Sequence, residues 1–193
     1  MLGLKLSTDP RWVKLADKEI EEILTDHAYC EQKAASTGIS LIVKFPDLED
    51  LVEQVSAVVE EEWGHFQMVL EELKKRNLKL GFQRKDLYVH ELNQRIKNNG
   101  KRDEILLDKL LQLALIEARS CERFKLLSLE CSDMELRKFY KRLMISEAGH
   151  YKLYLDLAIK YIDKEIVMKR WDEILNFETE VLSLIDLRGD RMH

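Results

Sequence analysis

The chain has 193 residues, and its composition is typical of a helical protein. It holds only 7 Gly and 2 Pro, while 46% of its residues are hydrophobic and 35% are charged. The longest stretch without Asp, Glu, Lys or Arg covers residues 34–43, far short of the ~20 residues that a membrane span needs. Three cysteines without a CxxC spacing exclude a disulfide framework and a zinc ribbon. We therefore expect a single domain over 1–193 without a membrane span, in the reducing cytoplasm.

Apolar positions three and four residues apart predict helices along most of the chain. Long helices are expected at residues 12–43, 47–76, 103–130 and 164–187, and a further one begins at residue 132 and has an apolar face that reaches residue 158. Ser132 and Glu135 have the spacing of a capping box at its start. Residues 77–102 break the pattern and form a connector with a short helix over 87–96. The predicted fold is all-α: a four-helix bundle with a long crossover between helices two and three and an additional C-terminal helix.

Polar residues interrupt the apolar faces of four of these helices in a repeated pattern. In each half of the chain, a helix with one inward glutamate precedes a helix that carries Glu-x-x-His on its apolar face. Residues three apart share a helical face, so each Glu-x-x-His pair directs a carboxylate and an imidazole toward one point. The corresponding residues of the two halves are offset by 86, 85 and 85 positions. The first half contains Glu31, Glu62 and His65, and the second contains Glu117, Glu147 and His150.

Four carboxylates inside one bundle repel each other, and burying even one without compensation costs several kcal/mol. Two divalent cations would balance the four charges, and two neutral imidazoles would complete the ligand set. Oxygen-rich ligands with one histidine per metal favour iron or manganese, whereas zinc attracts more nitrogen or sulfur. In the alternative interpretation the glutamates pair with Arg or Lys, the protein is purely structural, and no metal binds.

The arrangement resembles the ferritin-like di-iron carboxylate proteins, in which two helices contribute one Glu each and two contribute Glu-x-x-His. This resemblance implies a ferritin-like bundle with two Fe ions, or Mn in their place. It also implies the roles of the ligands. Glu31 and His65 would bind one metal, Glu117 and His150 would bind the other, and Glu62 and Glu147 would bridge them.

Four local sequences are similar to a narrower family. They are HAYCEQKAA at 27–35, EEWGHF at 61–66, IEARSCERF at 116–124 and SEAGHY at 146–151. Together they resemble the bacterial tRNA hydroxylases that act on 2-methylthio-N6-isopentenyladenosine, with similarity from residue 12 to about 161. The resemblance implies a monooxygenase that hydroxylates the isopentenyl group beside the tRNA anticodon with O₂ as co-substrate. Because no GxGxxG fingerprint is present, a separate reductase is expected to supply electrons.

The connector is strongly basic. Residues 74–102 hold ten basic and two acidic side chains, a net charge of +8 that leaves −13 for the rest. Such a cluster can neutralise phosphates of tRNA, although it is also compatible with a solvated connector. The candidate tRNA-binding residues are Lys74, Lys75, Arg76, Lys79, Arg84, Lys85, Lys97, Lys101 and Arg102.

Other functions use the same six ligands. A ferroxidase or iron-handling protein predicts a multi-subunit shell, whereas the hydroxylase predicts a monomer or small oligomer. A manganese catalase-like or peroxide-scavenging bundle is a further alternative. His27 lies one turn before Glu31 and could hydrogen-bond it, but a histidine satisfied in the core or at the surface is the more frequent case.

Overall fold

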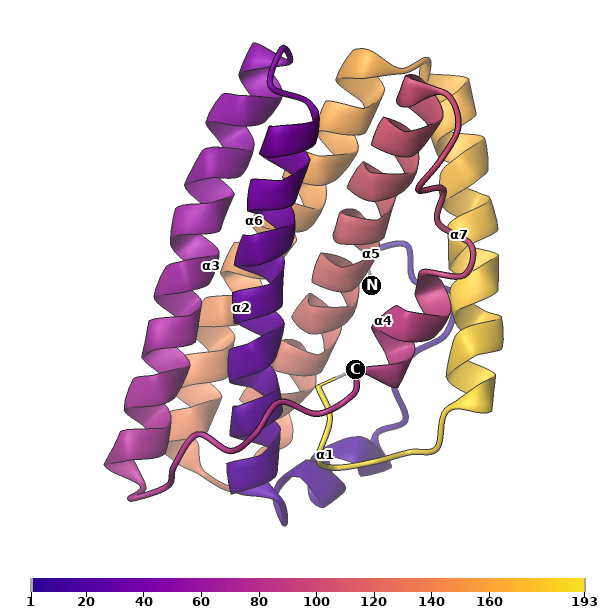
Figure 1. Cartoon of the computed structure of the whole chain (residues 1–193). Helices are drawn as coiled ribbons and strands as arrows, with labels where there is room; N and C mark the ends of the chain where they lie inside the picture. Colours follow the sequence, from indigo (N-terminus) through magenta and orange to yellow (C-terminus); the bar gives the residue numbers. More distant parts are fainter. Residues whose placement is uncertain (1, 193) are drawn as a thin grey trace. The chain divides into compact units, whose positions relative to one another are not determined.

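The computed structural model describes residues 2–192, which form seven helices and no strand (Figure 1). The helices are α1 (Arg11–Ala16), α2 (Ile20–Lys44), α3 (Glu49–Lys75), α4 (Leu87–Leu92), α5 (Arg102–Glu130), α6 (Met134–Tyr161) and α7 (Lys164–Leu184). The all-α prediction is confirmed. No helix in this part of the chain is long and apolar enough to cross a membrane.

The chain divides into two compact units. One contains α1, α2 and α3 within Arg11–Lys85, together with the C-terminal segment Arg188–Met192. The other contains α4, α5, α6 and α7 within Asp86–Leu187, together with the N-terminal residues up to Pro10. The boundary at Lys85 lies inside the predicted connector. The prediction of one domain over 1–193 stays a prediction.

In the first unit, α2 and α3 lie side by side as a helical hairpin joined by residues 45–48 (Figure 1). The predicted apolar face of α3 is buried along its length, including Glu62 and His65. Gly38 permits the close approach of the helices, because a Cβ atom there would lie 2.6 Å from Cγ2 of Val59. The hairpin therefore aligns the polar positions of α2 with those of α3.

In the second unit, α5 packs against α6 and also contacts α7. Polar groups join its parts: Arg119 of α5 is fully buried and donates from Nε to Glu178 of α7 at 2.9 Å. Tyr88 of α4 donates to the same carboxylate oxygen at 2.7 Å. The backbone carbonyl of Leu6 accepts from Arg119 at 2.9 Å. This buried network fixes the α4 and N-terminal segments against α5 and α7.

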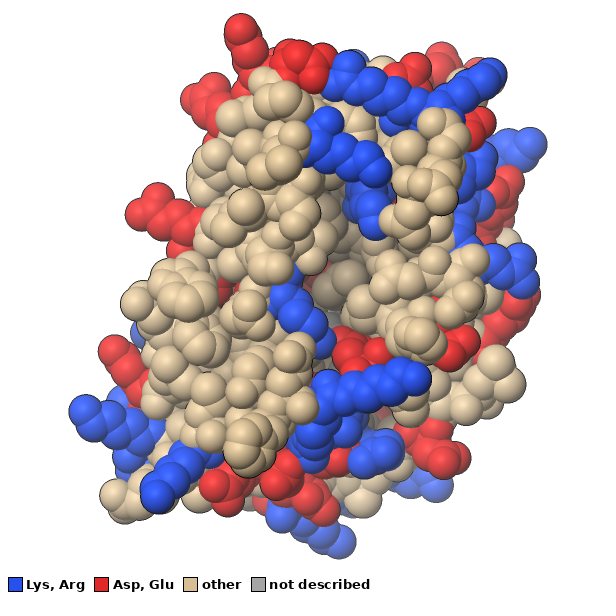
Figure 2. Space-filling model, in the orientation of Figure 1, with Lys and Arg blue, Asp and Glu red and all other residues tan. Residues whose placement is uncertain are grey.

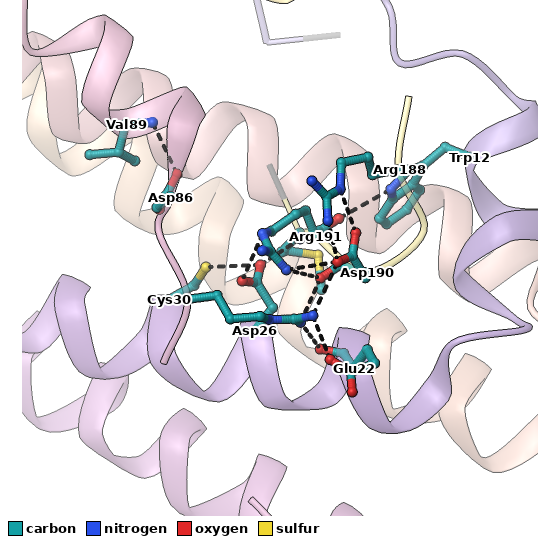
Figure 3. A network of polar contacts seen from close by, with 11 residues as sticks. Trp12, Glu22, Asp26, Cys30, Asp86, Val89, Arg188, Asp190 and Arg191 are labelled. Atoms are coloured by element: carbon teal, nitrogen blue, oxygen red, sulfur yellow. Dashed lines mark hydrogen bonds and ion pairs between the residues drawn. The ribbon is translucent and has the colours of Figure 1, made fainter. Parts of the chain in front are cut away.

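The C-terminal segment Arg188–Met192 packs on α1 and α2 (Figure 3). Trp12 of α1 donates from its indole nitrogen to the carbonyl of Arg191 at 3.2 Å. The backbone N–H of Met192 donates to Asp26 of α2 at 2.7 Å. Gly189 lies so close to α1 that a Cβ atom there would be 2.3 Å from the carbonyl carbon of Leu15. The segment Arg188–Met192 thus joins α1 to the N-terminal half of α2.

Some predicted helix boundaries are wrong. The expected helix over 12–43 is two helices, because residues 17–19 form a turn in which Lys18 and Glu19 bond back to Leu15 and Ala16. The capping residue of α6 is Asp133, not Ser132, and it accepts from the N–H groups of two residues that follow it. The short helix ends at Leu92 instead of residue 96, and α7 ends at Leu184 instead of residue 187.

Candidate metal centre

Three potential metal ligands lie together on α2 and α3. Glu31 projects from α2, and Glu62 and His65 project from adjacent turns of α3. Each offers a ligand atom, and these atoms lie within 4.8 Å of one another. Nδ1 of His65 is 3.8 Å from Oε2 of Glu31 and 3.7 Å from Oε2 of Glu62. All three side chains are buried, as the interrupted apolar faces predict.

His27 supports this triad from one turn earlier on α2. Its Nε2 lies 2.5 Å from Oε1 of Glu31, and the ring is fully buried. Burial, followed by the charge of His65, lowers the pKa of His27 to about 3, so the imidazole is neutral. A neutral ring with Nε2 protonated donates to the carboxylate and orients it. Of the two interpretations of His27, the structure supports the hydrogen bond to Glu31.

Burial and mutual interaction shift the pKa values of the residues in the first triad. Burial, followed by the nearby charge of Glu62, raises the pKa of Glu31 to about 8. Burial alone would lower the pKa of His65, but the carboxylates of Glu31 and Glu62 raise it to about 10. The groups that shift the pKa of Glu31 most include no lysine or arginine. For Glu31, this argues against neutralisation by a lysine or an arginine.

A second triad lies on α5 and α6. Glu117 of α5 and the Glu147–His150 pair of α6 offer ligand atoms within 4.8 Å of one another. Their side chains are as buried as those of the first triad, with 2%, 2% and 4% exposure. Cys121, one turn after Glu117, donates from its thiol to the carbonyl of Met144. Burial raises the pKa of this thiol to about 11, so it is a protonated core residue.

Each triad therefore presents two carboxylates and one imidazole in a buried setting. Such oxygen-rich donor sets fit iron or manganese better than zinc, whose structural sites favour sulfur and nitrogen. Ionised carboxylates without a compensating charge are costly there, and a divalent cation removes that cost. The residues present thus fit a metal site, with one triad in each compact unit.

The nine candidate tRNA-binding residues differ in how their charges are used. Lys75 and Arg76 pair with Glu72 at the end of α3. Arg84 pairs with two acidic residues, and Lys97 lies 3.2 Å from Glu104. Arg102 begins α5. Within residues 2–192, no hydrogen bond or ion pair engages the side chains of Lys74, Lys79, Lys85 and Lys101.

These basic residues also belong to different parts of the molecule. Those up to Lys85 lie in the first unit, and those from Lys97 lie in the second. On the face drawn in Figure 2, basic and acidic side chains are interspersed among larger uncharged areas. The basic cluster of residues 74–102 is thus divided between the two units. It also contains both paired and unpaired cations, which a count of charges does not distinguish.

Sequence reasoning missed the buried ion pairs of the second unit. Arg119 and Glu178 lie 59 positions apart, and neither has a periodic or spacing signal that pairs them. Arg119 also pairs with Glu122, three residues further along α5. A charged pair at this spacing is common on solvated helices, so only burial reveals its structural role.

Comparison with known proteins identifies relatives over nearly the whole chain. A family model described as tRNA-(MS[2]IO[6]A)-hydroxylase (MiaE) matches residues 2–193. A Pseudomonas putida protein named tRNA 2-(methylsulfanyl)-N(6)-isopentenyladenosine(37) hydroxylase is 36% identical over 179 residues, which cover 93% of this chain and 86% of that protein. A protein of the same name from Salmonella typhimurium is 29% identical, covering 80% of this chain and 74% of its own length.

A solved structure is also similar. It is a protein with aldehyde deformylating oxygenase activity from Synechococcus, with a TM-score of 0.93 and 33% sequence identity. The match covers 98% of this chain and 94% of that one. The predicted all-α, ferritin-like fold class is confirmed by this similarity.

Proposed function

The chain belongs to the tRNA-(MS[2]IO[6]A)-hydroxylase family, and from this premise we propose that it hydroxylates the isopentenyl group of 2-methylthio-N6-isopentenyladenosine in tRNA. The family match over residues 2–193 is the observation that carries this proposal. The buried Glu/Glu/His triads supply the kind of site that the reaction requires. The proposed substrate is therefore a tRNA that carries this modified nucleoside beside its anticodon. The proposed location of the enzyme is the cytoplasm.

The six buried residues are the proposed metal ligands, and each triad would hold one iron ion. Support comes from the internal repeat, in which corresponding ligands are offset by 85 or 86 positions. It comes also from the donor set, since four carboxylates balance two divalent charges. When bound, the ions supply the activation of O₂ needed to oxidise an unactivated C–H bond. Manganese is the proposed alternative metal.

The chain's own residues hold and protect this chemistry. His27 donates to Glu31 and keeps that carboxylate oriented toward its triad. Apolar residues one turn from the ligands, such as Val58 and Val69 on α3, exclude water from the site. Inserting one oxygen atom into the substrate and reducing the other to water consumes two electrons and two protons. A separate reductase is the proposed donor, acting on a monomer or small oligomer of this chain.

The decisive experiment is a reconstituted reaction followed by nucleoside mass spectrometry. Purified protein loaded with Fe(II) is incubated with O₂, a chemical reductant and tRNA that carries 2-methylthio-N6-isopentenyladenosine. We expect a product heavier by one oxygen atom, and its loss in Glu62→Ala and Glu147→Ala. Glu53→Gln, an exposed substitution on α3, serves as the matched control. Absence of the hydroxylated nucleoside with the loaded wild-type protein would overturn the proposal.

The same preparation tests the other functions. Aldehyde is offered in place of tRNA, because the Synechococcus protein has aldehyde deformylating oxygenase activity. Ferrous oxidation without substrate and peroxide decomposition are measured in parallel. If tRNA does not react, turnover of aldehyde would indicate an aldehyde oxygenase, oxidation of Fe(II) would indicate a ferroxidase, and decomposition of peroxide would indicate a catalase-like or peroxide-scavenging protein.

A further inference from the structure

The connector between α3 and α4 contains a loop that is fastened to α2. The backbone N–H of Lys79 donates to the carboxylate of Glu21 at 3.4 Å. Two residues later, the N–H of Gly81 donates to Oγ1 of Thr25 at 3.2 Å, and its carbonyl accepts from the hydroxyl of Tyr29 at 2.9 Å. The three α2 residues are spaced four apart, so the loop follows one face of that helix over two turns.

Arg84 fastens the far end of the same loop. Its guanidinium donates to the carbonyl of Glu22 at 3.1 Å and to the carbonyl of Asp190 at 2.9 Å, and it forms ion pairs with both side chains. Figure 3 shows Glu22 on α2 beside Asp190 of the C-terminal segment. We call residues 79–84, held in this way at both ends, the anchored loop. The positive charge of Arg84 is thus paired with the carboxylates of Glu22 and Asp190.

Phe82 lies in the middle of the anchored loop and is 93% exposed. No other large hydrophobic side chain in residues 2–192 reaches that value; the next is Leu184 at 80%. An exposed phenylalanine does not contribute to the stability of the fold as a buried one would, so its exposure is compatible with a binding role. Because hydrogen bonds hold the loop to α2 on both sides of it, Phe82 is presented to solvent as an aromatic platform.

Cations without partners flank this platform. Lys79 and Lys85 are exposed, and no hydrogen bond or ion pair within the described residues engages their side chains. Each is three residues from Phe82, within about 11 Å along even a fully extended chain. An aromatic face between two free cations matches a nucleobase between two phosphates, since single-stranded RNA is bound by stacking together with phosphate contacts.

We propose that Phe82 stacks on an unpaired nucleobase of the tRNA anticodon loop, while Lys79 and Lys85 contact neighbouring phosphates. This inference rests on the proposed function and names the residues that position its substrate. The loop follows α2 at Thr25 and Tyr29, the same turns that carry His27 and Glu31. A base stacked on Phe82 would bind beside the part of α2 that also holds a metal ligand. Arg84, by contrast, positions the loop and does not contact RNA.

The test measures binding of a fluorescent anticodon stem-loop RNA to the metal-loaded protein. We expect Phe82→Ala to raise Kd by about 5- to 150-fold, the range observed for loss of one stacked base. Phe82→Trp should keep Kd within about twofold, and its indole fluorescence should be quenched when RNA binds. Val43→Ala removes another exposed apolar side chain of the same unit, 14 positions along α2 from Tyr29, and should bind as wild type.

Salt dependence separates the aromatic from the cationic contribution. Replacing both Lys79 and Lys85 with glutamine should reduce the slope of log K against log salt by about 1.4, for two phosphates of a single strand. Phe82→Ala should leave this slope unchanged because it removes no charge. An unchanged slope in the double variant would overturn the phosphate contacts.

The outcomes also distinguish failure of this inference from failure of the proposed function. If wild type hydroxylates the RNA and Phe82→Ala binds it equally well, stacking is overturned and the hydroxylase stands. If Phe82→Ala binds RNA normally but loses turnover only with a protein electron donor, the platform is a protein-docking site and the inference is overturned. If wild type binds no RNA and yields no hydroxylated nucleoside, both fail.

Discussion

Replacing Glu31 by glutamine tests whether the buried carboxylates are destabilising until a cation arrives. Glutamine keeps the shape of a protonated carboxyl and can still bond to His27. Burial and Glu62 raise the pKa of Glu31 from 4.5 to about 8. In the metal-free protein the folded state therefore holds a proton that the unfolded chain releases, so this residue's penalty grows as the pH rises from 4.5 to 8.

The magnitude follows from the shift. Each pH unit above 4.5 costs about 1.36 kcal/mol, which gives roughly 3 kcal/mol at pH 7 and about 5 kcal/mol above pH 8. Part of this gain is lost in the variant because Glu31 also interacts favourably with His65. We expect metal-free Glu31→Gln to be more stable than wild type by about 1 to 3 kcal/mol at pH 7, a rise in Tm of roughly 2–12 °C.

The assay compares urea unfolding of chelator-treated proteins between pH 4 and 9, then repeats it with Fe(II) or Mn(II). The stability gain should vanish near pH 4, where the carboxyl is protonated in both folded and unfolded states. Added metal should stabilise wild type, by about 2.7 kcal/mol at one hundred times Kd, and should stabilise the variant less. Glu53→Gln should behave as wild type throughout. A metal-free Glu31→Gln protein that is no more stable than wild type at pH 8 would refute the reasoning.

Three further substitutions probe the supporting structure. His27→Ala removes the hydrogen bond that orients Glu31, so metal affinity should fall by about 10- to 100-fold in a Mn(II) titration. Gly38→Leu drives a side chain into Val59, and should cost about 1 to 3 kcal/mol in urea unfolding, with partial recovery in the Gly38→Leu/Val59→Ala double variant. Arg119→Met leaves Glu178 buried without its ion-pair partner, and should cost about 3 to 5 kcal/mol by the same measurement.

Each has a result that would count against it. Unchanged metal affinity in His27→Ala would mean that Glu31 is oriented by other contacts. Additive costs in the Gly38 and Val59 cycle would show that the two side chains do not compete for space. Wild-type stability of the Arg119 variant would contradict a structural role for the buried network; Lys138→Met, which removes an exposed ion pair, provides its control.

Local features of the chain predicted much of the secondary structure because they depend on nearby residues. Glu62 and His65 were predicted to lie on the apolar face of the helix that is now α3, and both are buried there together with apolar residues such as Val58 and Val69. Ends were predicted less well. Ser132 has the spacing of a capping box, yet Asp133 caps α6, since adjacent polar residues compete for that position and one residue of register decides between them.

Contacts between distant segments required the tertiary structure. The pairing of Arg119 with Glu178 and the attachment of Met192 to Asp26 join residues 59 and 166 positions apart. The number of basic residues in the connector can be counted from the sequence. Only the fold shows that Arg84 binds Glu22 and Asp190, whereas the side chains of Lys79 and Lys85 make no hydrogen bond or ion pair within residues 2–192. The exposure of Phe82 likewise follows from where the anchored loop is fastened to α2.

The sequence by itself determined the helical class, the buried faces and the identity of both Glu/Glu/His triads. These depend on helical periodicity, which places residues three or four positions apart on one face whatever the helix packs against. The tertiary structure decided that the ligand atoms within each triad lie within 4.8 Å, that His27 bonds to Glu31, and which cations remain free. Those properties depend on packing between segments far apart in the chain, which no local spacing encodes.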